Sequence, residues 1–159
     1  MQLSTVAAYL ADHQVMALAV QDHEGAWSAP VYYAVLDGDK LIFLSRLDSR
    51  HGQALLHHPQ AAFSIYSDAC QWTEIRGLQG EGQVRLLQGD ARDRAKQGYL
   101  ERFAFIAQDP QLLQSMNKVS WFELEISTLL WLDNQNGLGQ RVAIDVKSER
   151  FKQVWNARV

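Results

Sequence analysis

The chain has 159 residues, 47% of them hydrophobic, and a formal net charge of −3, which suits one domain with one hydrophobic core. Its 15 basic residues are scattered and balanced by 18 acidic ones, so it lacks the basic surplus that nucleic-acid binding requires. The only cysteine, Cys70, excludes an internal disulfide and a multi-thiolate metal site.

The N-terminal third predicts one helix and three antiparallel strands. Apolar residues recur at helical spacing from Leu3 to Leu10, which indicates a short helix ending near His13. Strands are expected over residues 15–20, 27–36 and 41–45. Asp37-Gly38 separates the last two, and this pair supplies the positive φ angles of a tight hairpin turn. The first residues are not basic and the run at 15–20 is too short to span a bilayer, so we expect a cytoplasmic protein without a membrane partner.

The middle of the chain predicts a short helix and two further strands. Asp48 or Ser49 can cap the helix, and Pro59 stops it because proline donates no helical hydrogen bond. A fourth strand is expected at residues 61–66 and a long fifth strand at residues 72–87. Glycines within this fifth strand predict a bulge or a close backbone approach, so the strand can bend around a barrel.

The C-terminal half predicts helices followed by the last strands. A helix capped by Asp90 is expected to reach about Phe103, and a shorter one begins at Asp109-Pro110. In the strand at residues 122–132, Glu123 and Glu125 alternate with apolar residues, which we interpret as a wet strand face rather than a catalytic acid pair. A further strand is predicted at 141–144, and the tail at 147–159 is expected to dock through Phe151, Val154 and Trp155.

These elements predict a mainly β fold. Six to seven strands without regular strand–helix–strand alternation favour a closed antiparallel barrel with short helices over a parallel sheet. The pattern shows no repeat or domain boundary, so residues 1–159 are expected to form a single domain.

The segment from Leu44 to Gly52 is the strongest candidate for a binding site. It joins a strand to a helix start and contains serine hydroxyls, arginine and histidine, which together can hold a phosphate group. An ordinary capped surface helix would carry the same residues. Adjacent His57 and His58 point about 100° apart on a helix, so no metal site is predicted there.

The order of several motifs adds a family resemblance. Ala29-Pro30-Val31-Tyr32-Tyr33, then Asp37-Gly38 and Leu41-Ile42-Phe43-Leu44-Ser45, lead into Ser49-Arg50-His51-Gly52 and His58-Pro59; Arg76-Gly77 and Glu81-Gly82-Gln83-Val84 follow. From about Thr5 to Trp131 the chain resembles the split-barrel family that binds flavin mononucleotide (FMN) and includes pyridoxamine 5′-phosphate oxidase.

The resemblance implies a homodimer with FMN at the seam between subunits, acting as an oxidoreductase on a small redox substrate. It implies that Ser49, Arg50 and His51 hold the phosphate with help from Ser45, while the backbone of Leu44 and Ser45 flanks the flavin ring. The remaining implied contacts are the backbone of Ala29, Pro30, Val31 and Tyr32 around the ring, and Arg76, Gly77, Gln79 and Trp131 from the second subunit.

The chain also departs from the oxidase itself. Ala29 and Ala34 stand where the oxidase has basic residues, and His51 stands where lysine is usual. The oxidase's C-terminal substrate segment has no counterpart, so we expect another branch of the family. No catalytic residue is predicted, since a flavin supplies the redox chemistry, and Trp72 is a candidate for the flavin pocket.

Two alternatives to an enzyme stay open at this point. One is a non-catalytic carrier or sensor on the same barrel, binding flavin or, through His51, His57 or His58, haem. The other is an interaction protein whose pocket has decayed, which the alanines at positions 29 and 34 suggest.

Overall fold

The computed structural model describes residues 2–158, and its centre is a closed antiparallel barrel. The sheet has seven strands in the order β3-β2-β1-β4-β5-β6-β7, and β3 also pairs with β6, so the first six close into a ring. The predicted mainly β barrel is therefore confirmed. The strands are β1 Val15–Asp22, β2 Gly25–Leu36, β3 Lys40–Ser45, β4 Gln60–Tyr66, β5 Arg76–Leu86, β6 Ser120–Asp133 and β7 Arg141–Ala143.

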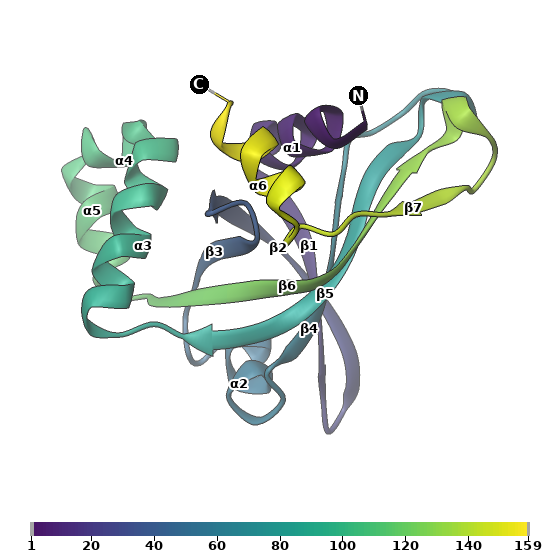
Figure 1. Ribbon diagram of the computed structural model, residues 1–159. Helices are drawn as coiled ribbons and strands as arrows, with labels where there is room; N and C mark the ends of the chain where they lie inside the picture. The colour runs from purple at the N-terminus through teal and green to yellow at the C-terminus, as the bar shows by residue number, and fades with distance from the viewer. Residues whose placement is uncertain (1, 159) are drawn as a thin grey trace.

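Six helices surround the barrel in three places. In Figure 1, α1 and α6 lie together above it, α2 lies below it, and α3, α4 and α5 form a group at one side, while β5, β6 and β7 extend as a long curved ribbon on the other. The helices are α1 Gln2–Asp12, α2 Arg50–His57, α3 Gly89–Arg102, α4 Ala104–Ala107, α5 Pro110–Met116 and α6 Glu149–Asn156, with 3₁₀ turns η1 Trp72–Glu74 and η2 Asn134–Asn136. No helix within residues 2–158 is long and apolar enough to cross a membrane.

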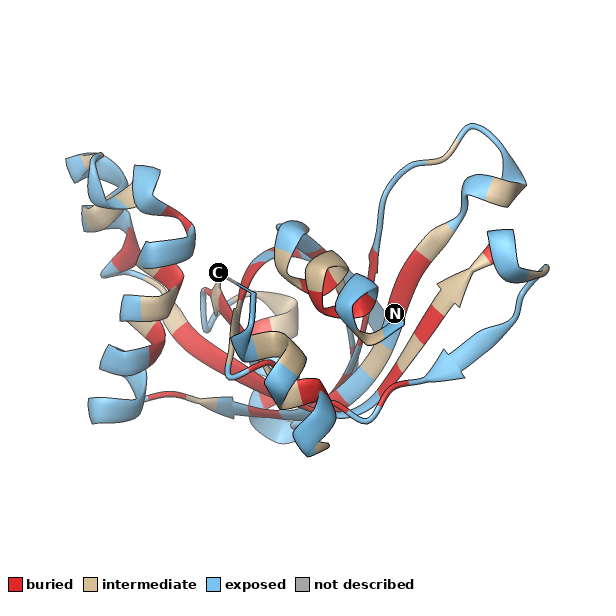
Figure 2. Cartoon of the chain, turned by 45° about the horizontal axis from the view of Figure 1, so that its top comes forward, coloured by how far each residue is buried: buried red, intermediate tan, exposed pale blue. Residues whose placement is uncertain are grey.

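Apolar packing divides into an inner core and a side core. At the strand pair that closes the barrel, the rings of Phe43 and Phe122 stack with centroids 5.3 Å apart. A second cluster lies between the sheet and α3–α5, where Trp121 meets Tyr99 edge to face. Figure 2 shows this helical group buried on the side toward the sheet and exposed on its outer side.

The hairpin between β2 and β3 forms as the Asp-Gly pair predicts. Asp37 has φ 59° and Gly38 φ 83°, the left-handed values that such a turn requires. A Cβ on Gly38 would lie 2.9 Å from the Trp155 ring, so this glycine also lets α6 pack closely against the turn. Phe151 of α6 is fully buried, which confirms docking of the described part of the tail.

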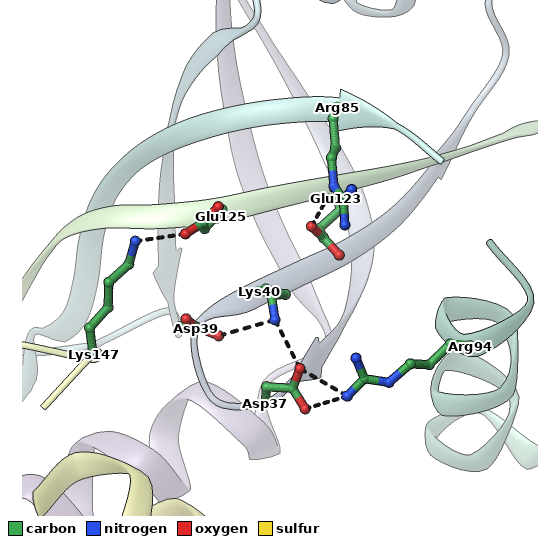
Figure 3. Close-up of polar contacts among 8 residues, drawn as sticks. All are labelled: Asp37, Asp39, Lys40, Arg85, Arg94, Glu123, Glu125 and Lys147. Atoms are coloured by element: carbon green, nitrogen blue, oxygen red, sulfur yellow. Dashed lines mark hydrogen bonds and ion pairs between the residues drawn. The ribbon is translucent and has the colours of Figure 1, made fainter. Parts of the chain in front are cut away.

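The outer side of the β3–β6 seam carries a balanced set of charges (Figure 3). Lys40 reaches Asp37 at 2.9 Å, and Arg94 of α3 reaches the same carboxylate at 2.8 Å. Arg85 pairs with Glu123 at 2.8 Å, and Lys147 pairs with Glu125 at 2.6 Å. These ion pairs join the hairpin turn, the seam, α3 and the C-terminal segment on one surface.

Three local predictions are wrong. The fifth strand begins at Arg76 rather than Trp72, because residues 72–74 form a 3₁₀ turn closed by the Glu74 carboxylate. Helix α3 is capped at Gln88 and starts at Gly89, so Asp90 lies in its first turn. Glu123 does not sit on a wet face: it is 5% exposed, because the Arg85 side chain lies against it. Helix α4 was not foreseen.

The glycines of β5 let strands approach where the ladder is irregular. The β5–β6 register shifts between Glu81 and Gly82, and a Cβ on Gly82 would clash with the backbone carbonyl of Glu125. The extra residue of this bulge, Ser127, belongs to β6, so the close backbone approach predicted for the glycines of β5 is confirmed, while the bulge itself lies in the neighbouring strand.

We expect Gly82→Ala to lower the free energy of unfolding by about 1–3 kcal/mol, because the added methyl group meets backbone that cannot move aside cheaply. Denaturant titration followed by circular dichroism measures the change. Gly98→Ala in α3 is the matched control, since its Cβ would meet only the Leu36 side chain at 3.4 Å and alanine favours a helix. Equal stability of Gly82→Ala and the wild type would contradict this account of the bulge.

Candidate functional site

The barrel is split between β2 and β3. Strand β2 pairs with β1 from Gly25 to Tyr32, whereas its ladder with β3 covers only residues 33–36 against residues 40–43. Beyond the pair Tyr33–Phe43 the two strands part, and the last residues of β3 pair with β6 alone. The segments predicted to flank a flavin ring, 29–32 and 44–45, lie on the two sides of this split.

At the split, backbone polar groups of β2 have no partner strand and face an open edge. Tyr33 donates its amide to the carbonyl of Gln14 at 3.0 Å, and an antiparallel ladder alternates the direction of these groups from one residue to the next. The main-chain groups of Tyr32 and the carbonyl of Pro30 therefore face away from β1, toward the split. A planar ligand with a polar rim could find both a donor and an acceptor there.

Three predicted phosphate ligands come together at one end of the split. Ser45 Oγ lies 2.9 Å from Ser49 Oγ and 2.7 Å from His51 Nε2, and Ser49 donates to the carbonyl of Arg46 at 2.7 Å. A consistent order of donors runs from His51 Nε2–H through Ser45 and Ser49 to that carbonyl. We call Ser45, Ser49 and His51 the hydroxyl–imidazole cluster.

Helix α2 begins at this cluster. Ser49 is its N-cap and accepts the amide of Gly52 at 3.1 Å, so one of the two predicted caps is the observed one. The amides of Arg50 and His51 belong to the first turn, which an α-helix leaves without intrahelical partners. Burial lowers the pKa of His51 below its usual value of 6.5, so its imidazole is neutral at pH 7 and the cluster carries no positive charge of its own.

Arg50 does not join the hydroxyl–imidazole cluster. Its guanidinium donates from Nε and Nη2 to the two carboxylate oxygens of Asp22, at 2.7 and 3.0 Å, and lies 4.5 Å from the centre of the Trp27 ring. The hydrogen bond from Arg50 lowers the pKa of Asp22 to about 2. Asp22 is the residue of this site that sequence reasoning missed, because 28 residues separate it from its partner.

The residues predicted to reach a partner's flavin lie across the sheet on β5 and β6. Arg76, Gly77 and Gln79 line a hollow of about 490 Å³, whereas Trp131 is buried and lines a second hollow of about 590 Å³ together with Arg76. Arg76 is held by Asp133 at 3.3 Å and by Gln135. These four residues thus face two hollows, and their contact with a second subunit stays a prediction.

Three histidines surround another hollow beside α2. His23, His57 and His58 line a space of about 510 Å³ together with Arg50 and Asp22. His57 and His58 face the same space although they are adjacent, because His58 is the C-cap and leaves the helical conformation. Among residues 2–158, no group of three or more His, Cys, Asp or Glu side chains could hold a metal ion. Trp72, the other pocket candidate, is 57% exposed in η1.

Comparison with known proteins agrees with this architecture. The family model described as pyridoxamine 5′-phosphate oxidase matches residues 4–154. A relative from Citrobacter koseri, a UPF0306 protein, is 29% identical over 143 residues, which make up 88% of this chain and 91% of the relative.

Solved structures share the fold at low sequence identity. A haem-binding protein from Mycobacterium smegmatis superposes with a TM-score of 0.72 and 19% identity, over 99% of this chain and 60% of that protein. An FAD-binding protein from Mesorhizobium loti superposes with a TM-score of 0.61 and 13% identity, over 89% and 93% of the two chains. The same barrel therefore occurs in proteins described as binding a flavin and in proteins described as binding haem.

Proposed function

Because the chain belongs to the pyridoxamine 5′-phosphate oxidase family, in a branch with UPF0306 relatives, we propose that it is a cytoplasmic FMN-binding oxidoreductase. The observation that carries the proposal is the split between β2 and β3, with the hydroxyl–imidazole cluster at its end. The phosphate binds at Ser45, Ser49 and His51 and at the first amides of α2. The ring lies along the split, between the backbone of 29–32 and that of Leu44 and Ser45.

The residues present fit this group in kind. A phosphate needs hydrogen-bond donors, and the free amides of α2 supply them directly. The serine hydroxyls and the imidazole, which hydrogen-bond to one another and to the Arg46 carbonyl, would turn their donors to the phosphate. A flavin ring needs main-chain donors and acceptors along its polar rim, which the open edge of β2 supplies at Tyr32 and Pro30. Bound FMN would supply the electron transfer, so the protein's tasks are to hold the ring, tune its surroundings and admit a small redox substrate.

We expect the purified protein to bind FMN at one per chain, with affinity that increases as the pH falls from 8 to 6. The His51 imidazole is neutral in the free protein, and a bound phosphate dianion raises its pKa, so binding takes up a proton. Affinity then gains about tenfold for each unit by which the phosphate raises that pKa. Fluorescence titration of FMN at several pH values measures the slope.

His51→Gln is the matched control, because glutamine can still hydrogen-bond to Ser45 but does not titrate. Its affinity for FMN should change less with pH than that of the wild type. A colourless protein that fails to bind added FMN would reject the proposed function. FMN binding with the same pH slope in both proteins would reject only the role of His51.

We also propose that the chain forms a homodimer through the outer face of β2, β1, β4 and β5. One row across this face is small on three of its strands: Ser28, Ala19 and Ala62 pair in turn and are exposed, and exposed Glu81 ends the row on β5. A flat face of small residues suits close contact with a second copy of the same surface. In such a dimer Gly77 and Gln79, whose side of β5 belongs to this face, would contribute to the partner's flavin site together with Arg76, which lines the same hollow. Trp131 is buried beside Leu78 on the other side of the sheet and would not reach that site.

We expect Ala62→Glu to convert the dimer to monomers, since it places like charges near each other across a two-fold interface and buries them. Analytical ultracentrifugation measures the mass, and circular dichroism checks the fold. Leu112→Glu adds the same charge on exposed α5, outside the proposed interface, and should leave the dimer intact. A wild-type monomer, or a dimer that Ala62→Glu does not affect, would overturn this interface.

The hollow lined by His23, His57 and His58 favours haem binding as the second candidate function. These three imidazoles reach an open space of about 510 Å³, and an imidazole is a common axial ligand of haem iron. His51, in contrast, directs its Nε2 to Ser45. Arg50 and Asp22 also line this hollow, but its three histidines are not among the proposed flavin ligands, so substituting them tests haem binding separately.

If haem binds here, haemin titration should give a shifted Soret band at one haem per chain. Replacing the ligating histidine among His23, His57 and His58 with alanine should abolish that shift, because the iron loses its axial nitrogen. His13→Ala serves as the control, since His13 is engaged with Ser67 elsewhere in the fold. An unchanged haemin spectrum on mixing would dismiss this candidate.

A further inference from the structure

Arg46, in the loop before α2, and Arg50, the first residue of α2, are both already bound to carboxylates. Arg46 pairs with Asp48, from Nε to Oδ1 at 2.8 Å and from Nη2 to Oδ2 at 2.5 Å. Arg50 pairs with Asp22 in the same two-pronged way. The segment that would receive a phosphate dianion therefore offers neither guanidinium in a free state.

The two pairs differ in their surroundings. Arg46 and Asp48 have side chains 70% and 67% exposed, whereas those of Arg50 and Asp22 are 30% and 13% exposed. The Arg50 guanidinium also lies over the Trp27 ring, and the Glu24 carboxylate is 3.9 Å from its Nη2. Exposed pairs exchange easily with water, but the Asp22–Arg50 pair is fixed by several contacts.

We propose that Asp22 is a built-in competitor of the ligand's phosphate for Arg50, and that it sets how strongly the site prefers a phosphorylated flavin over an unphosphorylated one. The inference rests on the proposed function. A carboxylate and a phosphate present similar pairs of oxygens to a guanidinium fork, so Arg50 can satisfy only one of them at a time. The ligand must displace Asp22 before the arginine contributes to binding.

This competition has a direct consequence for the ligand. An arginine that is free in only a small fraction of molecules lowers the apparent affinity by that fraction. The displaced Asp22 would also remain close by as a negative charge. Wild-type protein therefore distinguishes FMN from riboflavin weakly, through hydroxyls, imidazole and amides, and without the full contribution of a guanidinium.

The test compares FMN and riboflavin affinities in the dimeric wild-type protein and in Asp22→Asn. Asparagine keeps the shape of aspartate and the acceptor for the Glu24 amide, which Asp22 Oδ1 receives at 2.9 Å. We expect Asp22→Asn to bind FMN about tenfold more tightly than the wild type, with riboflavin affinity unchanged. Thermal melts check that the variant folds, and Asp22→Ser is a second variant should asparagine fail to fold.

Two further variants separate arginine release from a general change of charge. Asp48→Asn removes the same charge close to the start of α2 and frees Arg46, yet leaves the Asp22–Arg50 pair intact, so it should keep wild-type affinities. Adding Arg50→Ala to Asp22→Asn should remove the gain. An Asp48→Asn gain as large as that of Asp22→Asn, or no gain in Asp22→Asn, would overturn the proposal.

Inorganic phosphate separates failure of this inference from failure of the proposed function. The Nε–H signal of Arg50 in NMR spectra should move on adding phosphate to Asp22→Asn and stay fixed in the wild type. If that holds while neither protein binds FMN, Asp22 competes for the arginine but FMN is not the ligand. If FMN binds while the Arg50 signal of Asp22→Asn ignores phosphate, the flavin site stands and the competition is rejected. If no FMN binds and the Arg50 signal of Asp22→Asn does not move on adding phosphate, the proposed function and the competition are both rejected.

Discussion

The structure depends on how one strand is shared between two neighbours. Strand β2 pairs with β1 over residues 25–32 and with β3 only over residues 33–36. Strand β3 pairs with β6 along its whole length, and this pairing closes the barrel. Backbone polar groups without a ladder partner need another one, and a split edge beside a helix start gathers several of them in one place. The same constraint that closes the barrel thus creates a site at which a polar-rimmed ring and a phosphate can meet.

The basic side chains around this site are paired with carboxylates, so they give it no excess positive charge. On the seam, four basic residues face four acidic ones: Lys40, Arg85, Arg94 and Lys147 against Asp37, Asp39, Glu123 and Glu125. At the start of α2, Arg46 and Arg50 are each paired with an aspartate. Paired in this way, the basic residues hold the closing strands, α3 and the C-terminal segment together. The hydroxyl–imidazole cluster contains only hydroxyls and a neutral imidazole, which suits a ligand held mainly by hydrogen bonds.

Much of this fold could be predicted from local sequence signals, and the site only in part. The Asp37-Gly38 turn and the docking of the C-terminal segment depend on residues close together in the chain, and both were predicted correctly. For the same reason the observed cap, Ser49, is one of the two predicted. Errors came where distant residues decide. The Glu74 carboxylate turns residues 72–74 away from the strand, and Arg85 covers Glu123 from another strand. Asp22 captures Arg50 across 28 residues, and no local pattern around Arg50 announces an ion pair of that kind.

The outer sheet face is the part of the barrel that the proposed second copy would cover. Helices α3–α5 cover one part of the barrel, around Ala34, Ile42 and Trp121, but Ala19 and Ala62 lie exposed on the opposite part. Alanine and serine at such positions give a shallow surface that buries little area by itself, so only a broad, closely fitting partner gains from covering it. The residues of β5 that flank this face are those the family resemblance assigns to the neighbouring flavin. In the proposed dimer, association and cofactor binding would be linked, because each flavin site would draw on both chains.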